Sequence, residues 1–160
     1  MAKRADDLAQ RVELGARTLA EFVESLNDIQ WQAVVPQDGR TLGVMVHHVA
    51  SVYPLELKLA RMAASGEAIE GVTYDSAVRD MNAKHATEHS GVTRLETLEL
   101  LRENSKAAAE GVRQFRDEEL DRAVPVSLNG GALLTSQFVI EDHLVRHSIH
   151  HLSRMRAALK

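Results

Sequence analysis

The chain has 160 residues, of which 44% are hydrophobic and 26% are charged, a composition typical of one globular domain spanning residues 1–160. Its formal net charge of −4 argues against binding to nucleic acid. Charged residues at the N-terminus, and no apolar run near the roughly 20 residues of a membrane span, predict a cytoplasmic protein that does not bind membranes. The chain has eight histidines and no cysteine. The lack of cysteine excludes protein thiolates as metal ligands or nucleophiles.

Apolar residues recur at helical spacing in four long segments. The first covers residues 5–26 and the second covers residues 41–65, where Gly66 can end the helix. Pro54 lies inside the second helix and cannot donate to the carbonyl of Ala50. The third helix begins at Thr93, which forms a capping-box pattern with Glu96. The last helix covers roughly residues 134–159.

The connections between these helices predict their order in space. Residues 66–92 form a long connection that contains its own helical pattern at residues 76–89. A connection of this length can carry the chain back along the bundle, so that the second and third helices run parallel. Residues 123–128 alternate like a strand, but Pro125 interrupts them. We therefore expect an all-α, up-down-down-up four-helix bundle whose long crossover carries a short helix.

Three of the eight histidines are predicted to face the core. At about 100° per residue, His48 lies on the apolar face of the second helix. His147 and His151 lie close to the apolar face of the last helix, whose direction is taken from Leu133, Ile140, Leu144 and Met155. The same geometry places His143 and His150 at the edge of that face, and His47 toward solvent.

Buried imidazoles need polar partners, and a metal ion is one such partner. Histidines at i,i+4, such as His147 and His151, present ring nitrogens on one side of a helix. His48 from a facing helix would complete a three-histidine set with an open coordination position. The alternative is that all three are structural core histidines. The spacing favours the metal site.

Other residues could assist this site. Glu56 is predicted to face inward, where its carboxylate could hold the tautomer of a histidine ligand, although it could also lie beyond the core. His85 and His89 form a second i,i+4 pair on the crossover, with Asn82 on the same face. This segment is either a solvated short helix or a cover that adds polar groups to the site. Arg154, and also Arg146, could bind an anionic cofactor group or be exposed.

Two segments carry a family resemblance. They are TLGVMVHHVA at residues 41–50 and HLVRHSIHH at residues 143–151, and they resemble the second-helix and last-helix motifs of the DinB-like superfamily. This group includes the DinB- and YfiT-like metalloenzymes and is related to the N-terminal domain of the mycothiol-dependent maleylpyruvate isomerase. The resemblance covers nearly the whole chain. It implies a four-helix bundle, commonly a homodimer, with His48, His147 and His151 as metal ligands.

The resemblance also implies a type of chemistry. Superfamily members include metal-dependent transferases and isomerases that use a small thiol such as bacillithiol or mycothiol. This chain departs from relatives in two places: Leu152-Ser153-Arg154 replaces the Arg-Gly-Gln of many relatives, and some thiol-dependent relatives have Glu at the position of His147.

Our first hypothesis is a metal-dependent thiol S-transferase, isomerase or hydrolase that uses zinc or nickel. Its partners would be a small thiol and an electrophilic substrate, and the thiol must be imported because the chain has no cysteine. The alternatives are a non-catalytic metal-binding or stress-response module, and a helical interaction protein with structural histidines.

Overall fold

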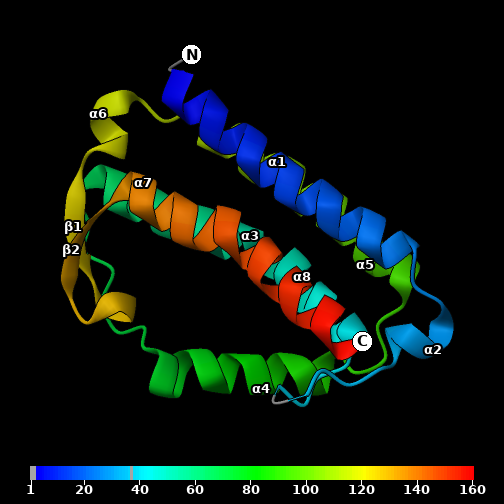
Figure 1. Cartoon of the computed structure of the whole chain (residues 1–160). Helices are drawn as coiled ribbons and strands as arrows, with labels where there is room; N and C mark the ends of the chain where they lie inside the picture. Colours follow the sequence, from blue (N-terminus) through cyan, green and yellow to red (C-terminus); the bar gives the residue numbers. More distant parts are fainter. Residues whose placement is uncertain (1–2, 37) are drawn as a thin grey trace.

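Four long helices form the body of the molecule. The structure, a computed structural model, describes residues 3–36 and 38–160. The first three helices are α1 (Lys3–Glu24), α3 (Leu42–Ser65) and α5 (Arg94–Val112). The last is continuous through α7 (Ser136–Val139), the π-helical turn η3 (Ile140–Val145) and α8 (Arg146–Ala158). As Figure 1 shows, α1 and the last helix run in one direction and α3 and α5 in the other, which confirms the up-down-down-up order.

Short elements make the connections. Helix α2 (Asp28–Trp31) follows α1, and α6 (Asp117–Leu120) follows α5. The long crossover contains a π-helical turn, η1 (Tyr74–Val78), and α4 (Arg79–Glu88). Helix α4 runs back beside the bundle, toward the end where α5 begins (Figure 1). Neither η1 nor α4 contains a fully buried residue, so this segment lies on the bundle rather than in its core.

Residues 123–135 form a small antiparallel hairpin, so the expectation of no strand here was wrong. Strands β1 (Ala123–Val126) and β2 (Ala132–Thr135) flank a 3₁₀ turn, η2 (Ser127–Asn129). Gly130 and Gly131 make the reversal with φ of 68° and 78°, a conformation that glycine adopts without strain. Pro125 still takes part in backbone pairing, because its carbonyl accepts a hydrogen bond from the amide of Ile69 at 3.0 Å.

The ends of the helices follow local sequence signals. Thr41 caps α3, and Gly66 ends it with φ of 88°. Thr93 caps α5 by accepting a hydrogen bond from the amide of Glu96. The hydroxyl of Thr93 in turn donates to the Glu96 carboxylate at 2.5 Å, so the glutamate binds the hydroxyl of the capping residue.

Helix α3 continues through Pro54. Proline removes the amide that would normally bond to the carbonyl four residues earlier. The side-chain amide of Asn104, on α5, donates instead to the carbonyl of Ala50 at 2.8 Å. The break in the backbone ladder is therefore repaired from a neighbouring helix.

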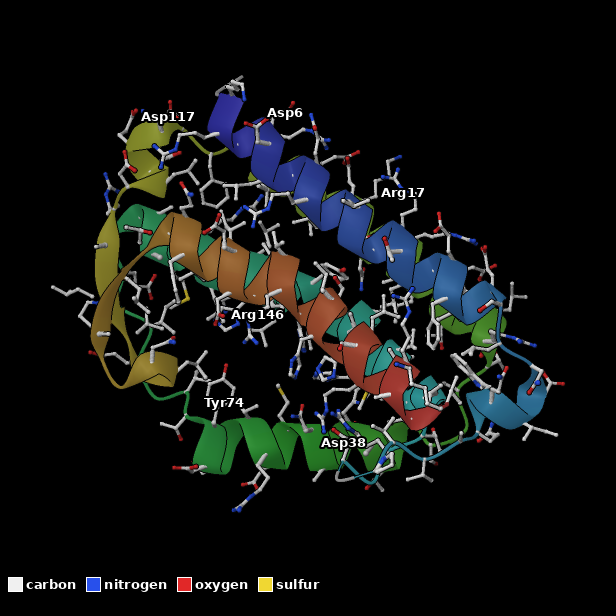
Figure 2. All side chains as sticks on the ribbon, viewed as in Figure 1. Asp6, Arg17, Asp38, Tyr74, Asp117 and Arg146 are labelled. Atoms are coloured by element: carbon white, nitrogen blue, oxygen red, sulfur yellow. The ribbon has the colours of Figure 1, made fainter. Side chains whose placement is uncertain are left out.

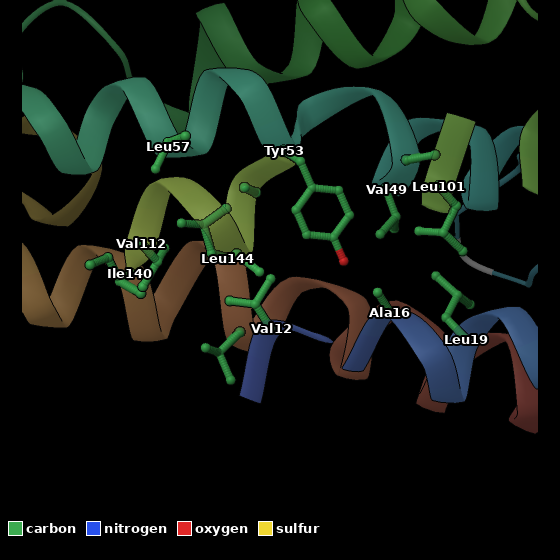
Figure 3. Packing of buried hydrophobic residues seen from close by; sticks show 14 of the residues in the cluster. Val12, Ala16, Leu19, Val49, Tyr53, Leu57, Leu101, Val112, Ile140 and Leu144 are labelled. Carbon is green, nitrogen blue, oxygen red and sulfur yellow. The ribbon is translucent and has the colours of Figure 1, made fainter. Parts of the chain in front are cut away.

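The core lies between the four long helices. Tyr53 of α3 is almost fully buried and sits between residues of α1, such as Ala16, and Leu144 of the last helix (Figure 3). The apolar face predicted for α1 is buried along its whole length, from Leu8 to Val23. Among the described residues, no helix is both long enough and apolar enough to cross a membrane.

Candidate metal centre

The structure brings His48, His147 and His151 together, from α3 and α8. The Nε2 atoms of His48 and His147 are 3.2 Å apart, and one ring nitrogen from each residue lies within 4.8 Å of the other two. His48 and His151 are buried, and His147 is half-buried. Two nitrogens held by one zinc ion at about 2.0–2.1 Å in tetrahedral geometry lie about 3.3 Å apart. The spacing of the His48–His147 pair therefore matches a common metal, and His151 lies near enough to act as the third ligand.

The local structure of the last helix explains why the spacing argument works for this pair. His147 and His151 both lie in α8, after the π-helical turn, so the regular α-helical period holds between them. His143 lies inside the turn, where that period does not apply. It is half-buried and lines the neighbouring cavity. His150 is exposed, with its ring packed edge-on against His151.

Glu56 lies behind His147. Of its two predicted positions, beside a histidine ligand or beyond the core, the structure has the first. Its side chain is buried, and Oε1 is 2.5 Å from Nδ1 of His147. A carboxylate at this distance holds the imidazole proton on Nδ1, which leaves a lone pair on Nε2. This is the nitrogen that faces His48. Glu56 thus prepares His147 to act as a ligand.

The environment keeps the other two rings neutral. Burial, followed by the electrostatic interaction with the neighbouring His147, lowers the pKa of His48 to about 3. Burial also lowers the pKa of His151 to about 2, with further contributions from His147 and His48. A metal ion binds only the unprotonated ring. Both histidines are therefore in the ligand form at neutral pH.

The donor set fits a divalent transition metal. The lone pair of His147 faces the ring of His48, and a cation between them would satisfy both rings at once. In the described part of the chain, the buried Nδ1 of His151 has no hydrogen-bond partner, and a buried polar atom without a partner needs an explanation such as an ion. Imidazole nitrogens suit zinc, nickel, copper and iron.

A cavity of about 480 Å³ opens beside the triad. All three histidines, Glu56 and Asn82 line it. Arg146, Tyr74 and Asp38 lie around the space between the last helix and the η1–α4 segment (Figure 2), and they line the same cavity. The apolar part of its wall is contributed by Val52, Leu55, Leu59, Val72, Ala77, Val78, Met81 and Leu128. The cavity can hold a small molecule next to the three imidazoles.

The arginines proposed for an anionic cofactor line this cavity but already have partners. Arg154 is half-buried, with its guanidinium 3.2 Å from the carboxylate of Asp38. The same carboxylate accepts two bonds from Arg40, at 2.5 and 3.0 Å. Arg146 is exposed and donates to Asp142 at 2.7 Å. An anionic group that binds here must therefore compete with these carboxylates.

His47 does not face open solvent, so that expectation was wrong. It is half-buried, and its ring stacks on His89 with centroids 4.2 Å apart. Its Nδ1 lies 2.9 Å from Nε2 of His85. Helix α4 covers this side of α3, but none of its residues is fully buried. Of the polar residues predicted on the crossover, only Asn82 lines the cavity of the first triad. Two features of the sequence signalled this cluster: the second i,i+4 pair, His85 and His89, and the consecutive histidines His47 and His48.

Leu133 is the other residue whose position was wrongly predicted. It lies in β2, where its side chain is 71% exposed, so it does not mark the inward face of the last helix. Ile140, Leu144 and Met155 do face inward and are buried. Of these, only Met155 lies in α8 with His147 and His151, so it is the residue whose regular helical period places both histidines near the buried face.

Comparison with known proteins identifies the family of the chain and agrees with its fold. The family model for the DinB superfamily matches residues 11–155. Among solved structures, YfiT from Bacillus subtilis, described as a probable metal-dependent hydrolase with an unusual four-helix bundle topology, superposes with a TM-score of 0.75 at 20% identity. The alignment covers 99% of this chain and 87% of YfiT. No curated protein matches the chain. Because the family model spans most of the sequence, the chain belongs to the DinB superfamily.

Proposed function

We propose that this protein is a metal-dependent enzyme that acts on a small electrophilic substrate. The observation that carries the proposal is the meeting of His48, His147 and His151 at the wall of a cavity of about 480 Å³. A structural histidine cluster does not need such a cavity. A catalytic metal site does, because substrate must reach the open coordination position.

The residues of the chain have separate roles in this proposal. His48, His147 and His151 hold the cation, and Glu56 keeps the proton of His147 on Nδ1. When bound, a divalent cation supplies Lewis-acid activation, which lowers the pKa of a coordinated thiol or water. The apolar wall of the cavity binds the substrate body and limits the access of water. Zinc or nickel is the proposed metal, because imidazole ligands suit both.

The nucleophile we propose is a small thiol, so that the reaction is an S-transfer or a thiol-assisted isomerisation. The chain has no cysteine, and the thiol must therefore enter the cavity as a separate molecule. Three neutral imidazoles leave the full charge of the cation available to hold a thiolate. Hydrolysis by water is the second candidate, favoured by the description of YfiT as a probable metal-dependent hydrolase.

The first experiment measures metal content. Freshly purified protein is expected to carry zinc or nickel by elemental analysis, and His151→Asn is expected to carry one equivalent less per chain. Ser153→Ala, which changes an exposed side chain two residues away, serves as the control and should keep the full content. If His151→Asn keeps all of its metal, the triad is not the metal site.

The second experiment separates the reactions. Metal-loaded protein is mixed with a panel of small thiols and a chromogenic electrophile, and in parallel with an activated ester without thiol. Thiol-dependent turnover that His151→Asn loses supports S-transfer, whereas thiol-independent ester cleavage supports hydrolysis. Metal binding without either reaction would favour the non-catalytic metal-binding module.

Two further proposals come from the sequence and the family resemblance. We propose that the protein works in the cytoplasm and as a homodimer. Light scattering of the purified protein measures its mass in solution, for comparison with the 17.7 kDa of one chain. A mass of one chain at micromolar concentration would contradict the dimer.

A further inference from the structure

A second histidine cluster lies next to the first, on the side of α3 that faces α4. The rings of His48 and His85, one from each cluster, are 5.6 Å apart at their centroids. His47 and His48 are consecutive, so their side chains diverge by about 100° around the helix axis. His48 joins the triad with α8, whereas His47 faces α4 and meets His85 and His89. The doublet therefore supplies one histidine to each of two clusters.

The geometry of the second cluster resembles that of the first. One ring nitrogen from each of His47, His85 and His89 lies within 4.8 Å of the other two. Nδ1 of His47 and Nε2 of His85 are 2.9 Å apart, and the rings of His85 and His89 lie 4.6 Å apart at their centroids. Within the described residues, the buried Nδ1 of His85 has no hydrogen-bond partner. Burying three imidazoles so close together is energetically favourable when a cation lies between their ring nitrogens and is bound by all three.

Helix α4 has little else to hold it in place. Neither α4 nor the preceding turn η1 contains a fully buried residue, and apolar burial is the main force that docks helices. His85 of α4 and His89, which directly follows the helix, are among the half-buried side chains of this segment. Both contact α3 through His47. Helix α4 also carries Met81 and Asn82, which line the cavity beside the first triad.

We propose that His47, His85 and His89 form a second site for a divalent transition metal ion, which fastens α4 to α3. The bound ion closes a loop between residues 47 and 89 and adds the binding free energy of the metal to the docking of α4. It thereby holds one wall of the cavity in place. This site goes beyond the proposed enzymatic function, because it uses none of the three ligands of the first triad.

The test is a zinc titration of chelator-treated full-length protein, in competition with a chromogenic chelator. The wild type is expected to bind two equivalents per chain. His89→Asn and His151→Asn are each expected to bind one. Loss of an outer hydrogen-bonding partner already lowers metal affinity by about 10–100-fold, so loss of a ligand should weaken its site by about 100-fold or more. Glu88→Asn, which alters an exposed neighbour of His89, should still bind two equivalents.

The outcomes separate the two sites. A wild type that binds one equivalent, lost in His151→Asn, overturns the second site and leaves the first intact. One equivalent that is lost in His89→Asn and kept in His151→Asn supports the second site and overturns the first. If His89→Asn and His85→Asn both still bind two equivalents, the second ion lies elsewhere and the proposal fails. Circular dichroism checks that each variant keeps its helical content.

The fastening of α4 has its own readout. Zinc at the second site is expected to slow amide hydrogen exchange in residues 79–88 by about tenfold or more in both the wild type and His151→Asn. Exchange in His89→Asn should not respond. If two equivalents bind to the wild type while exchange in α4 is unchanged, the ion binds without fastening the helix, and that part of the proposal is refuted.

Discussion

Replacing Glu56 by glutamine tests how the first triad is prepared for a metal. The carboxylate lies 2.5 Å from Nδ1 of His147 and is buried, so little solvent screens its charge. Glutamine keeps an oxygen that can accept the Nδ1 proton, but it removes the negative charge that makes Nε2 a stronger donor to metal. Glu56→Leu removes both the charge and the hydrogen-bond acceptor.

The magnitude follows from the role of such partners in metal sites. Loss of a residue that orients a histidine ligand costs about 10–100-fold in metal affinity, which corresponds to about 1.4–2.7 kcal/mol. Because glutamine still fixes the tautomer, we expect Glu56→Gln to lie near tenfold. Leucine leaves Nδ1 of His147 without a partner, so Glu56→Leu should lie near 100-fold.

The assay measures zinc affinity by chelator competition. It uses a His89→Asn background, so that only the first triad binds zinc. Glu67→Gln, an exposed glutamate near the end of α3, is the matched control and should leave the affinity unchanged. If Glu56→Gln and Glu56→Leu both bind zinc as tightly as the parent variant, the carboxylate does not prepare His147 and the reasoning is wrong.

Two further outcomes are expected. Burial holds the pKa of His48 at about 3 and that of His151 at about 2, well below the value of about 6.5 for an unfolded chain. The unfolded state therefore binds more protons below that pH. Metal-free protein should lose about 2.7 kcal/mol of stability between pH 7.5 and 5.5, measured by urea unfolding, and an unchanged midpoint would contradict this. Gly43→Ala should cost about 1–3 kcal/mol by thermal unfolding, because its Cβ would lie 2.7 Å from the rigid ring of Trp31. Gly91→Ala, where no atom lies within 4 Å of the added Cβ, should be nearly neutral, and equal losses in both variants would refute the steric argument.

The fold could be predicted from the sequence because its signals are local. Helical periodicity, Thr93 as a cap and Gly66 as a stop place the long helices within a few residues of their observed ends. The hairpin at residues 123–135 was missed because Pro125 was weighed as a strand breaker, whereas the glycine pair at residues 130–131 was a turn signal for two short strands.

The residues of the candidate site could be predicted where the buried face of a long helix determines the direction of a side chain. His48, His147 and His151 meet because each points into the bundle, and Glu56 follows the same geometry on α3. The position of His47 could not be predicted in this way. A helical wheel shows which side faces the other long helices, but it does not show that α4 returns to cover the opposite side.

The π-helical turn at residues 140–145 has a consequence for sequence comparison. A π turn holds one more residue than the α-helical turn it replaces, so it changes the register between the buried start of the last helix and the end that carries the histidines. A relative whose last helix is α-helical throughout needs one residue fewer between the positions of Ile140 and His147 to bury the same side chains. If such a relative is aligned without a gap on the core residues before the turn, its histidines are misplaced by one position. A one-residue gap inside the helix is then the structurally correct alignment.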